Sequence, residues 1–185
     1  MHQAGVVVVT RPGEHAGVEA DAAVTSAHGA VLAIRTADCA PVLLSDVSAG
    51  VVGAAHAGWR GVEAGVLKAT VESMVELGAS TASIRAYVGP CISPGAYEFG
   101  AADLTRLALR HGPDVVAATD DARPALDLRA LVVACLHEVG VGAAAIDLDP
   151  RCTALTTDQD AVPLFWSHRA RGDRARHVSL TWMEP

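Results

Sequence analysis

Two short apolar runs, separated by only a few residues, constrain the fold of this chain more than any other feature. The runs are Ala40 to Leu44 and Val51 to Ala55, and each is short enough to be a buried strand. If the loop around Ser48 to Gly50 joins them as neighbours, Cys39 before the first run and His56 after the second come close in space. We therefore expect these two side chains to form one site.

The chemistry of this pair is that of a thiol beside an imidazole. Such a pair is part of a metal site or of a Cys/His nucleophilic pair. Asp38 precedes Cys39 and Pro41 follows it, which indicates a strand edge, where a cysteine is placed for chemistry. The competing interpretation is that both residues belong to the core, Cys39 as a small buried side chain and His56 as a core histidine.

A glycine-rich turn follows His56 directly and favours a ligand site. It runs from Gly58 through Trp59 and Arg60 to Gly61. Glycines let a backbone approach a ligand closely. Trp59 offers a stacking face, and Arg60 offers a fixed cation suited to phosphate.

A catalytic zinc site uses three protein ligands and keeps a fourth position open, so Cys39 and His56 are one ligand short. His2 is the candidate for the third. Other histidines compete for that place: His28, His111, His137, His168 and His177. Arg169 and Arg171, close to His168, are candidates for binding an anion, with a solvated charged turn as the alternative.

The composition excludes several classes of protein. The chain has 185 residues and a formal net charge of -7, which argues against a nucleic-acid partner. Its apolar runs are strand-sized, so we expect no membrane span. The start lacks the pattern of a secretion signal, and the four scattered cysteines suit a reducing compartment. One domain over residues 1–185 and a cytoplasmic location are therefore expected.

Strands outnumber helices in the predicted pattern, which indicates a mixed α/β or α+β fold. Beyond the two central runs, the predicted strands are Val6 to Thr10, Ala22 to Thr25, Ala30 to Thr36, Ile84 to Val88 and Ala144 to Leu148. The predicted helices are Val62 to Leu77, Ala101 to Arg110 and Leu128 to Val139, the last capped by Asp127. Pro113 to Pro124 is expected to be a loop, and Leu164 to Ser167 is expected to pair with His177 to Trp182 in a last hairpin.

Several motifs of this chain resemble the laccase-domain family. The longest are TADCAPVLL from Thr36, AHAGWRG from Ala55 and GPCISPGAYE from Gly89. The match continues in order through Arg151 to Thr153, Phe165 to Arg169 and Ser179 to Trp182. The family has been called multicopper polyphenol oxidase, and its members are now interpreted as purine nucleoside phosphorylases.

The resemblance implies a fold, a metal site and an activity. The implied fold is a layered α-β-β-α sandwich of the type shared with cytotoxic necrotizing factor. The implied metal ligands are His2, Cys39 and His56, holding zinc, or copper in the older interpretation. The implied reactions are phosphorolysis of adenosine, inosine, guanosine and methylthioadenosine, and deamination of adenosine.

The sequence also departs from the family pattern. The family has a segment ahead of the metal-site histidine, with a TRxGGVS motif and an asparagine-rich stretch, and this sequence lacks it. Gln3 replaces the glycine after that histidine. The family's SYRRDG becomes SHRARG from Ser167, which keeps Arg169 and places His168 where the tyrosine would be.

For a phosphorylase, we expect Arg60 and Arg169 to bind phosphate or ribose beside Trp59, and Asp38 to shuttle a proton. Three alternatives stay open at this point. The first is a copper oxidoreductase acting on phenols, and the second is a metal-free hydrolase with Cys39 as nucleophile and His56 as base. The third is a non-enzymatic domain that needs a partner. No oligomeric state follows from the sequence.

Overall fold

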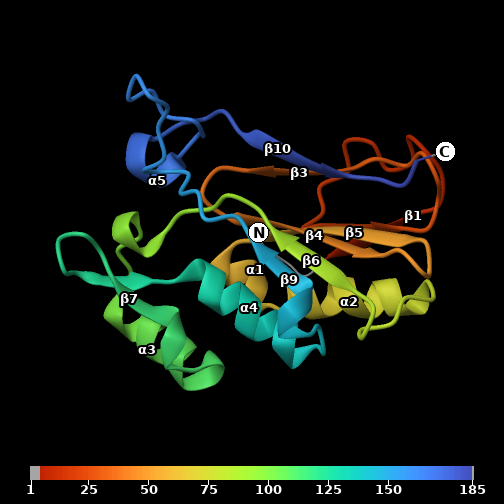
Figure 1. The fold of residues 1–185 in the computed structure, drawn as a ribbon, viewed down its shortest axis with the longest axis horizontal. Coiled ribbons are helices and arrows are strands. Elements are labelled where there is room, and N and C mark those ends of the chain that lie inside the picture. Colours follow the sequence, from red (N-terminus) through yellow and green to blue (C-terminus); the bar gives the residue numbers. More distant parts are fainter. Residues whose placement is uncertain (1–4, 185) are drawn as a thin grey trace.

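A six-stranded sheet forms the middle of the computed structural model, which describes residues 5–184 (Figure 1). Its strands, in spatial order, are β1 (Val6–Val9), β2 (Ala22–Thr25), β5 (Val51–Ala57), β4 (Ala40–Asp46), β6 (Arg85–Val88) and β9 (Ile146–Leu148). The β1–β2 and β6–β9 pairs are parallel, and the other pairs are antiparallel. The predicted neighbourhood of the two central strands, β4 and β5, is confirmed.

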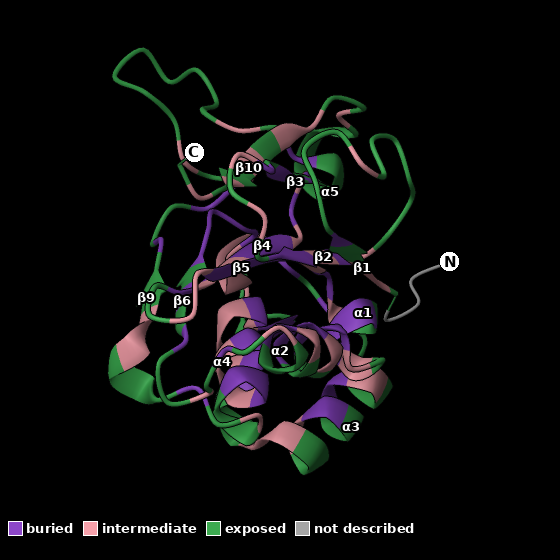
Figure 2. Ribbon diagram, turned by 90° about the vertical axis from the view of Figure 1, so that its right-hand side faces the viewer, coloured by how far each residue is buried: buried purple, intermediate pink, exposed green. Residues whose placement is uncertain are grey.

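Helices cover one face of this sheet, and a second sheet covers the other (Figure 2). The helices are α1 (Trp59–Glu63), α2 (Val66–Glu76), α3 (Ala101–His111) and α4 (Leu128–Glu138). The second sheet pairs β3 (Leu32–Thr36) with β10 (His177–Thr181), and the short helix α5 (His168–Arg171) lies beside it. This layering confirms the expected mixed α/β class.

Burial on both faces explains why β5 is made of small residues. Gly53 faces α2, where an added Cβ would lie 2.9 Å from the sulfur of Met74. That close approach lets Leu67 and Val71 of α2 pack in the core with Met74, each almost fully buried. Burying a side chain of this size contributes about 1.5–3 kcal/mol. The side chains of α2 therefore hold it close against the strand that carries His56.

The first predicted helix differs from the observed structure. Gly65 has a φ of 89°, in the left-handed region, and it separates α1 from α2 where one helix was expected. Val75, near the end of α2, is 43% exposed. The helix predicted from Leu128 is confirmed, and the Asp127 side chain accepts a hydrogen bond of 2.9 Å from the Ala130 amide as its cap.

The predicted last hairpin is wrong. Strand β10 pairs with β3, with His177 opposite Thr36, so its partner lies far away in the sequence. The Ser167 hydroxyl accepts from the Ala170 amide and starts α5, which lies between the two segments that were expected to pair. The segment expected to be a loop also contains structure, because β7 (Val116–Ala118) pairs with β8 (Pro124–Leu126).

Within residues 5–184, none of the helices has the length and apolar character needed to cross a lipid bilayer. All four cysteines are free thiols.

Candidate functional site

The pairing of β4 with β5 brings Cys39 and His56 close together. Pro41 lies opposite His56 and Ala40 lies opposite Ala57. Cys39 directly precedes β4, two residues before Pro41, and its sulfur and the Nε2 atom of His56 both lie within 4 Å of one point beside Gly58. The sheet itself therefore brings the thiol and the imidazole together.

Gly58 leaves an open point between these two groups. A Cβ at Gly58 would lie 2.8 Å from Cys39 Sγ and 3.9 Å from His56 Nε2. Any other residue would push its first carbon against the thiol. The glycine therefore keeps both donor atoms within 4 Å of one vacant point, which fits a bound ion.

Burial controls the protonation state of the Cys39 thiol. Desolvation, followed by the charge of Asp38, raises the pKa of the Cys39 thiol to about 11, and Arg176 opposes this shift. The Nε2 atom of His56 is also buried. A thiol with a raised pKa is the reverse of an activated nucleophile, whereas a metal ion displaces the proton when it binds.

Most of the predicted site residues line one cavity of about 180 Å³. Its wall includes Asp38, Cys39, Trp59, Arg60 and Arg169, together with Tyr97 and His168. Five of the predicted site residues therefore converge, although they come from three distant parts of the sequence. His56 lies beside the wall, across Gly58.

Aromatic rings hold the two cations of the cavity. The Arg60 guanidinium lies 4.4 Å from the ring centre of Trp59, and that of Arg169 lies 4.9 Å from Tyr97. Arg169 also donates a 2.9 Å hydrogen bond to the carbonyl of Glu98. Both guanidinium groups are thus fixed at the wall, which suits the binding of an anion.

Asp38 joins the segments that form the cavity. Its carboxylate accepts hydrogen bonds from the Thr153 hydroxyl at 2.8 Å, the Ser167 hydroxyl at 2.6 Å and the Arg169 amide at 2.7 Å. Its φ of 86° lies in the left-handed region, which is uncommon for a residue other than glycine. These contacts fix the start of α5 against the strand edge that carries Cys39.

The remaining histidines lie elsewhere or outside the described residues. His2, the predicted third ligand, is outside them. His177 Nε2 lies 2.9 Å from the Thr36 hydroxyl, and His28 Nδ1 lies 2.6 Å from the Glu184 carbonyl. His137 is exposed, and His111 lies in another cavity. Among the competing histidines, His168 alone lines this cavity.

Several residues that support the site carry no signal of that role in the sequence. Tyr97 lies within the GPCISPGAYE motif, but its residue type alone does not indicate a place in the cavity wall. Nothing in the sequence indicated that Thr153 and Ser167 meet Asp38. Cys91 is fully buried and lies outside the cavity lining.

Known proteins match the whole of this chain. A purine nucleoside phosphorylase of Mycobacterium tuberculosis is 39% identical over 186 residues, which cover 100% of this chain and 70% of the relative. A purine nucleoside phosphorylase of Corynebacterium glutamicum is 37% identical over 185 residues, covering 99% of this chain and 72% of the relative.

Solved structures share the fold. The crystal structure of YlmD from Geobacillus stearothermophilus matches with a TM-score of 0.82 and 27% identity, over 100% of this chain and 72% of that one. The Bacillus licheniformis hypothetical protein YfiH matches with a TM-score of 0.84 and 26% identity, over the same shares. Residues 1–184 match the family described as multi-copper polyphenol oxidoreductase laccase. The chain belongs to this family.

Proposed function

We propose that this chain is a zinc-dependent purine nucleoside phosphorylase. The observation that carries the proposal is the cavity in which two fixed guanidinium groups flank the Cys39 and His56 donor pair. Relatives named purine nucleoside phosphorylase support the reaction. The substrates are adenosine, inosine, guanosine and methylthioadenosine, and adenosine deamination in the cytoplasm is a further proposed activity.

In phosphorolysis the bond between C1′ and the purine nitrogen breaks as a bond from C1′ to a phosphate oxygen forms. The purine takes up a proton as it leaves, and ribose 1-phosphate remains. Arg60 and Arg169 are placed to bind the phosphate and hold it against the ribose. Fixed cations of this kind need no reorganisation during the reaction.

The size of the cavity limits what it holds. Its volume of about 180 Å³ is smaller than the roughly 300 Å³ at which most ligand pockets begin. We therefore place phosphate and ribose inside it and the purine at its mouth. Tyr97, whose pKa is raised to about 12 by burial and by Cys39, keeps its proton and can donate a hydrogen bond.

The donor set is suited to zinc. Cys39 and His56 supply a thiolate and an imidazole, and His2 would complete three ligands. Zinc bound there would supply a Lewis acid beside the two arginines. The structure supports a positioning role for Asp38, because its carboxylate already accepts three hydrogen bonds; the proton-shuttle role stays a prediction.

The raised pKa of Cys39 argues against the metal-free hydrolase. The proposal is tested by incubating the zinc-loaded chain with adenosine and with inosine, with and without phosphate. We expect adenine and hypoxanthine to be released only with phosphate, together with ribose 1-phosphate. Adenosine should also yield inosine without phosphate. A folded, zinc-bound protein that releases no base would overturn the phosphorylase assignment.

A further inference from the structure

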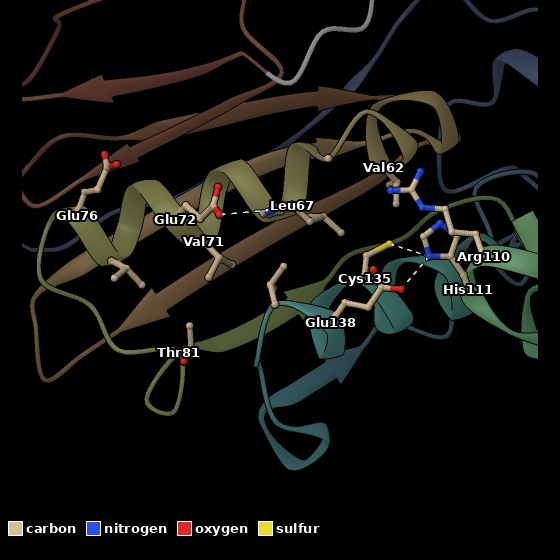
Figure 3. A pocket seen from close by; sticks show the side chains of 14 residues that line it. Val62, Leu67, Val71, Glu72, Glu76, Thr81, Arg110, His111, Cys135 and Glu138 are labelled. Atoms are coloured by element: carbon tan, nitrogen blue, oxygen red, sulfur yellow. Dashed lines mark hydrogen bonds and ion pairs between the residues drawn. The ribbon is translucent and has the colours of Figure 1, made fainter.

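A second and larger cavity lies on the helical side of the sheet, between α2 and α4 (Figure 3). Its volume is about 870 Å³, and its lining residues do not overlap with those of the first cavity. Leu67 and Val71 contribute to its apolar wall. At one end, Cys135 and Glu138 of α4 point toward His111, the last residue of α3.

Three different donor atoms converge at this end of the cavity. His111 Nδ1 lies 3.2 Å from Glu138 Oε1 and 3.6 Å from Cys135 Sγ. All three donor atoms lie within 4.8 Å of one another. A tetrahedral zinc ion, with its usual bond lengths, sets a sulfur and a nitrogen ligand about 3.6 Å apart and a nitrogen and an oxygen about 3.4 Å apart. The observed spacings match those of a zinc site.

The same contacts do not fit a catalytic triad. In a triad the carboxylate and the nucleophile use opposite nitrogens of the imidazole ring. Here the thiol of Cys135 and the carboxylate of Glu138 both meet Nδ1 of His111. Contacts from both groups to a single nitrogen are expected when one metal ion takes the place of the proton that the three groups share.

A simple ion pair is also a poor account of the cluster. The His111 side chain is 2% exposed, and its Nε2 atom is buried without a hydrogen-bond partner among residues 5–184. A protonated ring would bury a positive charge that has hydrogen-bond partners on Nδ1 alone, which is costly. A neutral imidazole avoids that buried charge and, with its proton on Nε2, presents the Nδ1 lone pair as a metal ligand.

Two helices carry the three donors of the cluster. Cys135 and Glu138 are three residues apart on α4, so they share one face of the helix. Cys135 is 8% exposed and Glu138 reaches the open side of the cavity. Two ligands from one helix and one from its neighbour form a preorganised set that leaves a fourth position toward the cavity.

We propose that His111, Cys135 and Glu138 form a zinc site separate from the Cys39 and His56 pair. The mixed set of one thiolate, one imidazole and one carboxylate favours zinc over the hard cations magnesium and calcium. The fourth position is open to water or to a small ligand that enters the cavity.

Cobalt(II) provides the test, because cobalt bound to a thiolate in a four-coordinate site gives a charge-transfer band and strong visible bands. The Cys39→Ser chain, which lacks the thiol of the other site, is titrated with cobalt. We expect one equivalent of cobalt to bind and to produce the thiolate charge-transfer band. Adding Cys135→Ser should abolish the band, whereas adding Cys152→Ser, at a cysteine of similar burial, should leave it unchanged.

A second pair of variants does not disturb the core. Glu138→Gln should weaken cobalt binding at least about 10-fold in the Cys39→Ser background, because a ligand is lost. Glu76→Gln removes the same charge from the wall of the same cavity and should have no effect. The proposal is overturned if folded Cys39→Ser protein shows no thiolate band, if the band survives Cys135→Ser, or if the two glutamine variants bind cobalt equally.

Discussion

Cys39 and Cys135 each lie beside a histidine, but the two pairs are built in different ways. Cys39 directly precedes β4 and His56 lies on β5, so the pairing of the two strands brings them together. Cys135 meets His111 through the packing of α4 beside the end of α3. Strand pairing fixes side chains over a few residues of sequence, whereas helix packing depends on distant contacts.

The two sites also differ in what surrounds them. The strand-built cavity is small, and two arginines line it. The helix-built cavity is large and mainly apolar, and Glu72, Glu76 and Glu138 line it with Lys68 and Arg110. The strand-built cavity is therefore suited to binding an anion beside a metal ion, and the helix-built cavity is suited to binding a cation beside an apolar wall. Variants that affect one site and spare the other test this comparison.

The largest effect is expected for Cys39→Ala. Removal of the thiol should lower zinc affinity at this site and nucleoside turnover by at least about 100-fold, because a ligand at the centre of the site is lost. Zinc content and base release measure the two effects. Cys152→Ser is the control, since Cys152 lies outside the cavity lining. A Cys39→Ala protein with full activity would contradict the proposed function.

Gly58→Ala should act on the same site without removing any ligand. The new Cβ would press on Cys39 Sγ at 2.8 Å, so zinc affinity should fall about 10-fold. In Gly61→Ala, the new Cβ would meet its nearest atom at 3.5 Å, an ordinary contact, and the helix would gain a better helix former. Chelator competition compares the two variants, and equal zinc affinities would refute the role given to Gly58.

Arg169→Ala should raise the KM for phosphate about 10-fold, because a charged hydrogen-bonding group contributes about 1.5–3 kcal/mol. Arg110→Ala removes the same charge from the other cavity and should leave this KM unchanged. Steady-state kinetics at varied phosphate measure both variants. An Arg169→Ala enzyme with an unchanged KM would separate this arginine from phosphate binding.

The smallest effect concerns acid stability. Hydrogen bonds from Arg151 hold the pKa of Asp149 well below its usual range. Because the folded pKa is depressed, this carboxylate stabilises the fold at neutral pH, and the contribution is lost as the pH falls below about 4 toward the folded pKa. Asp149→Asn should cost about 1–2 kcal/mol at pH 7 and less at pH 3.

Urea denaturation at the two pH values measures that change. Asp147→Asn is the control, since the Asp147 side chain is 71% exposed and lies 4.0 Å from Arg85. Arg151 lies two residues before Thr153, whose hydroxyl donates to Asp38. A stability difference that is the same at both pH values would rule out this linkage.

Much of the strand-built site was predictable from local sequence. The runs that became β4 and β5 are separated by a short loop, so their pairing and the closeness of Cys39 and His56 followed from length and pattern. The places of Trp59 and Arg60 beside this pair followed from the turn that adjoins His56. Arg169 was identified by motif, but its approach to this cavity depends on the contact of its amide with Asp38.

Other features could not be predicted because their partners are remote in sequence. Strand β10 pairs with β3 instead of forming the expected hairpin. The edge of β3 pairs with every residue of β10 from His177 to Thr181. The break at Gly65 was hidden within an amphipathic pattern that continues across it. Cys135 lies among the apolar residues of α4 and is buried, so its local sequence alone indicates a core residue.

The sequence by itself determined the class of fold, the central strand pair and the residues around Cys39, because each of these depends on spacing over a few residues. Only the tertiary structure decided that Asp38 would bind Thr153 and Ser167, and that His111 would meet Cys135 and Glu138. These contacts join residues more than twenty positions apart in the sequence, so they depend on how the layers pack. The packing energy is shared among many contacts, and no local sequence pattern records it.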